Sequence, residues 1–264
     1  MRPRRDQMHM KSAVLLVHFG VSLPDVRKKT IDRLEQLVRA HHPEQTVCSA
    51  YTSEMIRRKL ARQGIEIPNT DLALQQLADA GVTAVVIQPT HLIAGDEYHK
   101  MLDQLEAHRG RFESIRVGRP LLYAPEDYRR MADVLNAAYP CAADAALVLM
   151  GHGTGHAINA AYPALCYEFA HRGYEHIFLG TVEGYPDLDD VMQDLSRRAV
   201  QTVRLAPLLF VAGDHAQNDM AGDEPDSWKS RLTAAGYRVE PLVIGLGEIE
   251  AVQMMYLDHL DAVL

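Results

Sequence analysis

Short apolar runs alternate with longer segments of helical periodicity along the whole chain. The apolar runs predict strands at residues 13–17, 46–51, 84–88, 115–122, 145–150, 176–179, 202–205 and 237–244. Between them, helical spacing of apolar residues predicts helices at 25–40, 53–62, 71–80, 97–109, 125–138, 157–170, 187–198, 226–235 and 248–264. Strands that are apolar throughout and separated by helices are typical of parallel sheets covered on both faces. We therefore expect an α/β fold.

Two internal similarities divide the chain. Residues 89–97 (PTHLIAGDE) align without gaps with residues 207–215 (PLLFVAGDH), and residues 15–20 (LLVHFG) align more weakly with residues 148–153 (VLMGHG). The simpler alternative is that loops after strands favour Gly and Asp. We expect two pseudo-symmetric halves, at 1–124 and 125–264, each a parallel sheet flanked by helices, with a cleft between them. The last helix is free to pack back on the N-terminal half.

Composition excludes several classes of protein. The 264 residues carry a net charge of -8, with Lys+Arg 27 against Asp+Glu 35, which disfavours a binder of nucleic acid or of anionic membranes. No run of about 18 apolar residues predicts a membrane span. The chain has Cys 3 and no C-x-x-C, which argues against a cysteine zinc site and fits a reducing compartment. Its start lacks the apolar stretch of a secretion signal, so we expect a cytoplasmic protein.

The loop Gly151-His-Gly-Thr-Gly-His156 follows a predicted strand directly. It fails the dinucleotide pattern G-x-G-x-x-G, because His156 stands where Gly or Ala is needed. The chain also lacks the P-loop pattern, so we expect neither a nucleotide nor another organic cofactor. What remains is His152 between two glycines, which leave its imidazole uncrowded. The alternative is an ordinary turn histidine.

Two further loops carry a carboxylate and an imidazole at strand ends. Glu183 lies in Gly180-Thr-Val-Glu-Gly-Tyr-Pro186, where the alternative is a ribose-binding acid. His215 precedes Asp219 by four residues, so Asp219 is placed to orient the imidazole; the alternative is a solvated helix start. The carboxyl ends of parallel strands meet at one edge, so His152, Glu183 and His215 are expected to converge. This set suits divalent Co, Fe, Ni or Zn.

Four motifs in order, at residues 88–98, 149–154, 180–186 and 212–223, resemble the anaerobic sirohydrochlorin cobaltochelatases, which are class II tetrapyrrole chelatases. The resemblance spans roughly Val14 to Leu260. It implies an enzyme that inserts Co²⁺ into sirohydrochlorin (or precorrin-2) without ATP, in cobalamin synthesis. It also implies that His152 is the catalytic and metal-binding histidine, Glu183 a metal-binding and catalytic glutamate, and His215 the second metal-binding histidine.

Further residues are expected to contact the substrate. The predicted substrate contacts are Phe19, Gly20, His91 and Glu97. His18 stands where many relatives have a small polar residue, so its role is open. Sirohydrochlorin is rich in carboxylates. The candidate cations that would pair with these carboxylates are the runs 27–29 (RKK) and 57–59 (RRK), together with Lys100. Each run also fits a solvated helix face.

Metal insertion must remove two pyrrole N–H protons and exchange the water of the ion for ring nitrogens. A neutral imidazole, with an ordinary pKa of about 6.5, accepts a proton near neutral pH. In this interpretation His152 holds the ion first and then accepts a proton, or divides these two roles with His215. Glu183 offsets part of the ion's charge and is a second acceptor for protons that leave the ring. The alternatives are a ferrochelatase or nickel chelatase on the same macrocycle, a metal or tetrapyrrole carrier without turnover, and a dinucleotide oxidoreductase. The physiological metal and the formation of a homo-oligomer stay open.

Overall fold

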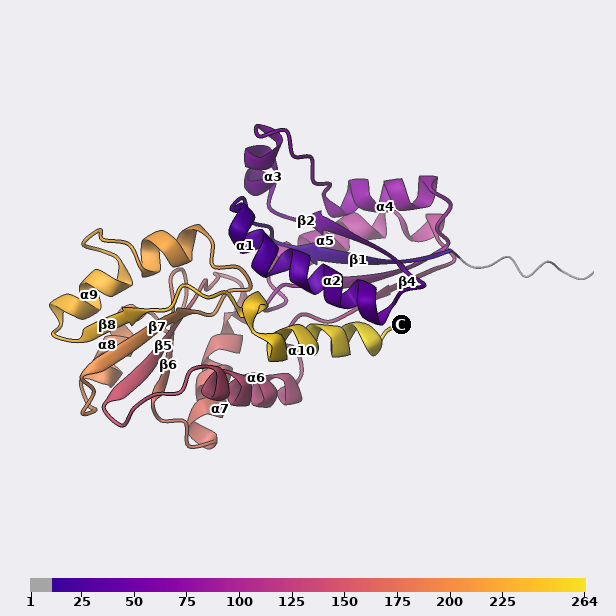
Figure 1. Ribbon diagram of the computed structural model, residues 1–264. Helices are drawn as coiled ribbons and strands as arrows, with labels where there is room; N and C mark the ends of the chain where they lie inside the picture. Colours follow the sequence, from indigo (N-terminus) through magenta and orange to yellow (C-terminus); the bar gives the residue numbers. More distant parts are fainter. Residues whose placement is uncertain (1–10) are drawn as a thin grey trace, which may run out of the picture.

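Two parallel four-stranded sheets form the framework of the molecule (Figure 1). The computed structural model describes residues 11–264. The strand order is β2-β1-β3-β4 in the first sheet and β6-β5-β7-β8 in the second, so both halves have the same topology. The strands are β1 (Ser12–His18), β2 (Thr46–Tyr51), β3 (Ala84–Pro89), β4 (Ser114–Val117), β5 (Ala145–Gly151), β6 (Ile177–Thr181), β7 (Thr202–Pro207) and β8 (Arg238–Pro241). The predicted α/β fold with two similar halves is confirmed.

Helices cover both faces of each sheet. The α-helices are α1 (Pro24–Lys29), α2 (Ile31–His41), α3 (Glu54–Ala61), α4 (Thr70–Asp79), α5 (Asp96–Glu106), α6 (Pro125–Ala138), α7 (Ala161–His171), α8 (Leu188–Leu195), α9 (Trp228–Ala234) and α10 (Glu250–Asp261). Short 3-10 turns are η1 (Arg109–Arg111), η2 (Ala157–Ala160) and η4 (Leu246–Glu248), and η3 (Ala216–Met220) is a π-helical turn. Figure 1 shows α4 and α5 on one face of the first sheet, with α2 and α10 on the other. None of these helices is both long and apolar enough to span a membrane, within residues 11–264.

The last helix, α10, packs against the first sheet although it ends the chain. The hydroxyl of Tyr256 on α10 donates to the carbonyl of Thr90, at 2.9 Å, just beyond β3. One apolar cluster joins the two halves, with Leu16 and Leu34 from the first and Leu147 from the second. A division into units at residues 124 and 125 stays a prediction.

Three predicted elements differ from the structure. The helix expected at 25–40 breaks at Thr30, whose hydroxyl donates to the Val26 carbonyl at 2.6 Å. The strand expected at 115–122 ends at Val117, because Pro120 has no N–H for a strand ladder. The strand expected at 237–244 ends at Pro241: the N–H of Leu242 still donates to the Leu205 carbonyl at 2.7 Å, and the chain then turns, with the N–H of Ile244 donating to the Leu242 carbonyl at 2.8 Å. After β4 the apolar run continues as a loop with Leu121 and Leu122 buried, whereas after β8 Val243 and Ile244 are exposed.

Candidate active site

His152 lies immediately after β5, in a loop whose backbone is shaped by Gly153. Gly153 has φ +80, and a β-carbon there would lie 2.6 Å from the backbone nitrogen of Gly184. The two loops therefore approach closely only because this position is glycine. The N–H of Glu183 donates to the carbonyl of His152 at 2.8 Å, which fixes the loops side by side.

The orientation of the His152 ring leaves one nitrogen free. Nδ1 lies 2.9 Å from the carbonyl of Gly153, and because a carbonyl only accepts, Nδ1 carries the proton. In the neutral ring Nε2 then has an unshared electron pair, as a metal ligand or proton acceptor requires. The side chain of His152 is 40% exposed, so this nitrogen can be reached from solvent.

Glu183 and His215 are both neighbours of His152. Oε2 of Glu183 lies 3.9 Å from Nδ1 of His152, and the rings of His152 and His215 meet edge to face with centroids 4.8 Å apart. The structure thus brings together the three residues that the sequence singled out. Among residues 11–264, no three His, Cys, Asp or Glu side chains already have the spacing that holds a metal ion. A common ion would require small side-chain adjustments, which surface-exposed groups can make.

Asp219 contacts His215 as the spacing of four residues predicted. Nδ1 of His215 donates to Oδ2 of Asp219 at 2.5 Å across the π-helical turn η3. The carboxylate holds the proton on Nδ1 and leaves Nε2 of His215 available. Both imidazoles at this site therefore present the same free nitrogen.

The loops of the first half carry the predicted substrate residues. Phe19 follows β1 and is 44% exposed, and Gly20 has φ +108 with the Tyr51 ring where a β-carbon would stand. Glu97 is the second residue of α5, with Oε2 at 3.6 Å from Nζ of Lys100. His91 is different, because burial lowers the pKa of its ring to about 4 and keeps it neutral. Contact of these residues with a macrocycle stays a prediction.

His18 is fully buried and serves the packing between the halves. Its Nδ1 lies 2.9 Å from Oγ1 of Thr90 and its Nε2 lies 3.3 Å from Oγ of Ser49. Its ring stacks on Phe210 of the second half, with centroids 6.0 Å apart. Burial, and less strongly the nearby His91 and Arg27, lower the pKa of His18 to about 3.

Sequence reasoning missed the residues that brace the site. The hydroxyl of Tyr162 accepts from the N–H of Gly153 at 3.2 Å. Asn159 accepts from the N–H of Thr154 through Oδ1 and donates to the Tyr185 carbonyl through Nδ2. These residues lie in η2 and α7, where helical periodicity gives no sign of a role at a strand end.

Comparison with known proteins identifies the family. The family model described as cobalt chelatase (CbiK) matches residues 12–264. The chain belongs to this family. A relative from Salmonella typhimurium, a sirohydrochlorin cobaltochelatase, is 40% identical over 257 residues, which cover 97% of this chain and 97% of the relative. Sirohydrochlorin cobaltochelatase CbiKC of Nitratidesulfovibrio vulgaris is 37% identical over 266 residues, 99% of this chain and 94% of the relative.

Solved structures support the fold of this cobalt chelatase family member. SirB from Bacillus subtilis with Fe³⁺ has a TM-score of 0.65 at 14% identity, over 96% of this chain and 95% of that one. At this identity the similarity concerns the fold alone. The resemblance inferred from four motifs is confirmed by the family match.

Proposed function

We propose that the chain inserts Co²⁺ into sirohydrochlorin without ATP, with His152, Glu183 and His215 as the residues that handle the ion. The observation that carries this proposal is the contact of His152 with both Glu183 and His215 at the carboxyl ends of β5, β6 and β7. Relatives named for this reaction match almost the full length of the chain. Precorrin-2 has the same four nitrogens and is a second macrocycle for the same site.

The proposed chemistry divides between proton and metal transfer. Co²⁺ is a substrate, held first by Nε2 of His152, Nε2 of His215 and the Glu183 carboxylate, whose negative charge offsets part of the ion's charge. The ring nitrogens then replace these ligands and the water of the ion. Two pyrrole N–H protons leave, and His152, once released from the ion, accepts one of them. Glu183 is placed to receive the second.

The surroundings of the two imidazoles support this division. The carbonyl of Gly153 and the carboxylate of Asp219 each accept from an Nδ1–H, so both histidines keep Nε2 free, and their rings lie with centroids 4.8 Å apart. Such hydrogen bonds orient a ligand and raise its basicity. No nucleotide is needed in this scheme, because exchange of ligands on the ion is coupled only to proton release.

The three cysteines support a cytoplasmic location. Cys48, Cys141 and Cys166 are all free thiols in the structure. Free thiols persist in a reducing compartment. We propose that the reaction takes place there.

An absorbance assay tests the proposal. Sirohydrochlorin is mixed with Co²⁺, Fe²⁺ or Ni²⁺ in turn, with and without the protein, under anaerobic conditions. We expect the protein to accelerate the spectral change on Co²⁺ insertion, with no effect of added ATP. Equal rates with and without protein for Co²⁺ would exclude the proposed function, and faster insertion of Fe²⁺ or Ni²⁺ would reassign the metal.

A further inference from the structure

Helix α3 lies at the border between the halves and has two different faces. Its inner face carries Ile56 and Leu60, which pack in one apolar cluster with Phe210 and Val211 of the second half. The cap of the helix is the Ser53 side chain, which accepts from the N–H of Ile56. The helix is thus anchored next to the loop that leads to His215.

The start of α3 is fixed beside the first-half wall of the site. The N–H of Ser53 donates to the carbonyl of Phe19 at 3.1 Å. Phe19 is 44% exposed and Met55, two residues after Ser53, is 70% exposed. Two large apolar side chains therefore lie in solvent at the carboxyl ends of β1 and β2, where ligands of open α/β sheets bind.

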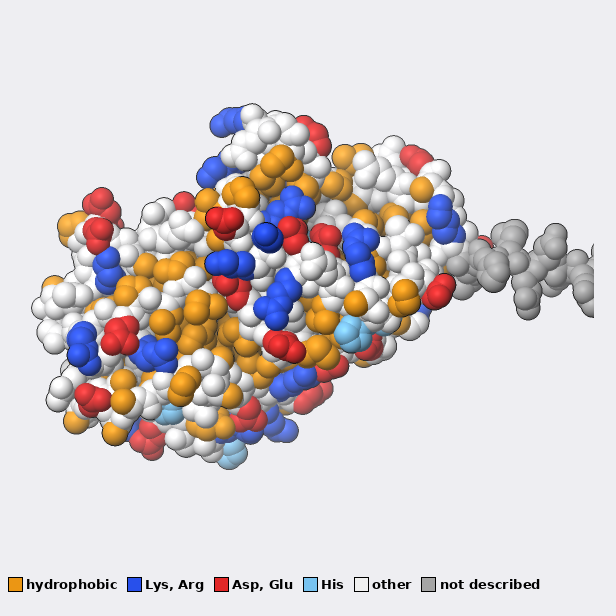
Figure 2. All heavy atoms as spheres, viewed as in Figure 1, with side chains coloured by type: hydrophobic (Ala, Val, Ile, Leu, Met, Phe, Trp, Pro, Cys, Tyr) orange, Lys and Arg blue, Asp and Glu red, His pale blue; other side chains and the backbone are white. Residues whose placement is uncertain are grey.

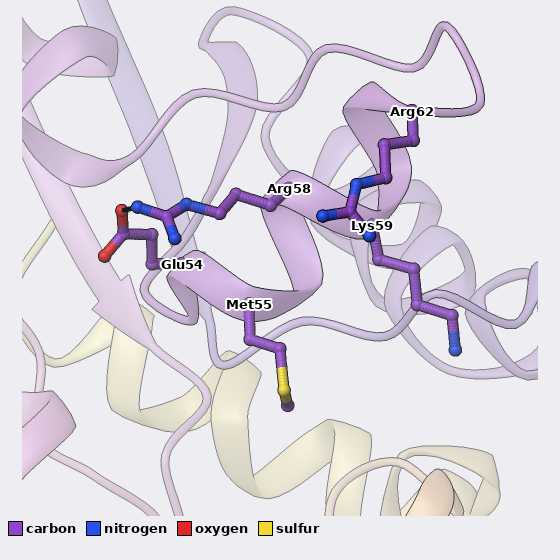
Figure 3. Close-up of a pocket in the computed structure, with 5 residues that line it drawn as sticks. All are labelled: Glu54, Met55, Arg58, Lys59 and Arg62. Atoms are coloured by element: carbon purple, nitrogen blue, oxygen red, sulfur yellow. Dashed lines mark hydrogen bonds and ion pairs between the residues drawn. The ribbon is translucent and has the colours of Figure 1, made fainter.

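The outer face of α3 is basic. A shallow hollow of about 430 Å³ on this face is lined by Glu54, Met55, Arg58, Lys59 and Arg62 (Figure 3). Arg58 forms an ion pair with Glu54. Within residues 11–264, no carboxylate lies within ion-pair distance of Lys59 or Arg62. Arg57 differs from these three, because its Nε donates to the Ile67 carbonyl at 2.9 Å and anchors the returning loop.

This basic face stands out against the charge of the whole chain. The net charge is -8, yet residues 58–62 contain three cations and no acid. Figure 2 shows Lys and Arg side chains over α1 to α3 with Asp and Glu side chains among them, and the surface is indented between α3 and the second half. In a helix the step from Met55 to Arg62 spans about 10 Å, and the spacing of four and three residues places Met55, Lys59 and Arg62 along one side of α3.

We infer that the outer face of α3 recognises the carboxylates of the tetrapyrrole, with Lys59 and Arg62 as the residues that decide which macrocycles bind. This inference rests on the proposed function and deepens it. Met55 contacts the apolar ring edge, Lys59 and Arg62 pair with acid side chains on the rim, and Arg58 can exchange Glu54 for a substrate carboxylate. The occupant is a flat apolar ring with a rim rich in carboxylates, because the face pairs an exposed apolar side chain with unpartnered cations.

The alternatives to this occupant fit less well. A nucleic acid or an anionic membrane is large enough to be repelled by the net charge of -8 of the whole chain. A macrocycle is small enough to contact only the basic face of α3. Exposed ion pairs are individually weak, so the effect comes from two cations acting together. For loss of both we expect a rise in KM of about tenfold, with kcat changed less than about twofold.

The test compares two double variants in the full-length protein. Lys59→Gln with Arg62→Gln removes the unpartnered cations of α3. Arg109→Gln with Arg116→Gln removes the same charge from η1 and from β4, the edge of the first sheet opposite to β2. All four side chains are exposed, so both variants should fold. The measurements are the Kd of metal-free sirohydrochlorin from its fluorescence, and KM and kcat for Co²⁺ insertion, at low and high ionic strength.

We expect the α3 variant to raise Kd and KM about tenfold at low ionic strength and to lose most of the salt dependence seen in the unaltered protein. The control variant should shift both by less than about twofold. Coproporphyrin has half the carboxylates of uroporphyrin. In the same binding assay the α3 variant should therefore raise the Kd of coproporphyrin less than that of uroporphyrin. Equal shifts in the two variants would overturn the inference while leaving metal insertion established. Absence of sirohydrochlorin binding in the unaltered protein would instead count against the proposed function.

Discussion

Phe19 occupies in the first half the place that His152 occupies in the second. The N–H of Ser53 donates to the carbonyl of Phe19 at 3.1 Å, as the N–H of Glu183 donates to that of His152 at 2.8 Å. Both are followed by a glycine with positive φ, Gly20 and Gly153. The same backbone thus presents an aromatic ring on one side and an imidazole on the other. The two halves share this backbone frame, and only the second half has an imidazole at this position.

His152→Ala should abolish metal insertion while leaving macrocycle binding nearly intact. The variant lacks the proposed proton acceptor, whose loss typically costs about 10²–10⁴-fold in rate, and the proposed metal ligand as well. The affinity for sirohydrochlorin should change by less than about tenfold, because the ring and its carboxylates keep their other contacts. Insertion rates and fluorescence binding measure the two effects. His171→Ala, an exposed histidine on α7, is the matched control and should be fully active. If His152→Ala inserted Co²⁺ at the wild-type rate, His152 would not have the role that the proposed mechanism gives it.

Asp219→Ala should weaken Co²⁺ binding through His215. The carboxylate accepts from Nδ1 of His215 and fixes the ring, and loss of such a partner typically costs about 10–100-fold in metal affinity or activity. Equilibrium dialysis with Co²⁺ measures the affinity. Asp214→Ala is the control, since the Asp214 carboxylate accepts only from Asn218. If both variants bind Co²⁺ equally well, Asp219 does not position a ligand.

Gly153→Ala should disrupt the site through the backbone. The residue has φ +80, and its β-carbon would lie 2.6 Å from the nitrogen of Gly184 and 2.9 Å from the carbonyl carbon of Glu183. We expect a loss of about 1–3 kcal/mol in the free energy of unfolding, together with loss of insertion activity. Gly155→Ala is the control, because no atom lies within 4 Å of its β-carbon. Urea denaturation of both variants distinguishes a specific clash from a general intolerance of the loop.

His18 should make the stability of the fold depend on pH. Burial lowers the pKa of this ring to about 3 from 6.5. Between these values the unfolded chain binds more protons than the folded chain, so the folded state loses stability as the pH falls below 6.5. The slope from one such group is about 1.4 kcal/mol per pH unit. His18→Gln should therefore be less stable at pH 7.5 but should lose less stability between pH 6 and pH 5 than the unaltered protein. Urea denaturation at the three pH values measures this, and identical slopes would contradict it.

The sequence predicts the fold well because the apolar pattern of each strand and helix indicates how deeply that element is buried. β3 and β5 are buried along their whole length, so their apolar runs could belong only to central strands. The alignment of residues 89–97 with 207–215 agrees with the backbone, because the N–H of Thr90 donates to Val17 and that of Leu208 donates to Met150, each at 2.8 Å. Errors fall where one polar group decides the outcome, as with the side-chain hydroxyl of Thr30 or the missing N–H of Pro120.

The sequence predicts which residues of the site come together, but not the residues that hold the site loops in place. His152, Glu183 and His215 follow strands, and parallel strands bring their carboxyl ends together without further information. Asn159 and Tyr162 hold the loops through hydrogen bonds to backbone groups. Such contacts produce no periodic pattern in the sequence from which they could be predicted. The approach of His99 to His156, with ring centroids 5.4 Å apart, depends on how the two halves meet. That arrangement is a property of the packed molecule and not of any one segment.

Asp127 should be the residue that most strongly ties α10 to the segment joining the halves. Its carboxylate accepts from Arg119 at 2.8 Å and from Nε2 of His259 on α10 at 2.9 Å, and from the N–H of Ala124 at 2.8 Å. The side chains of Asp127 and His259 are each 4% exposed. Asp127→Ala would leave Nε2 of His259 buried without an acceptor, whereas Arg119 is half-buried and keeps Glu126, so we expect a loss of about 1–3 kcal/mol in the free energy of unfolding.

The matched control for Asp127 is its neighbour Glu126. Glu126 also pairs with Arg119, at 3.5 Å, but its side chain is 64% exposed. Glu126→Ala should therefore cost less than about 1 kcal/mol. Urea denaturation compares the two variants, and hydrogen exchange should show that Asp127→Ala loosens α10 before the second sheet. If both variants lost the same small stability, the hold of α10 on the first half would have to come from its apolar face, through Tyr256 and its neighbours, and not from the buried carboxylate.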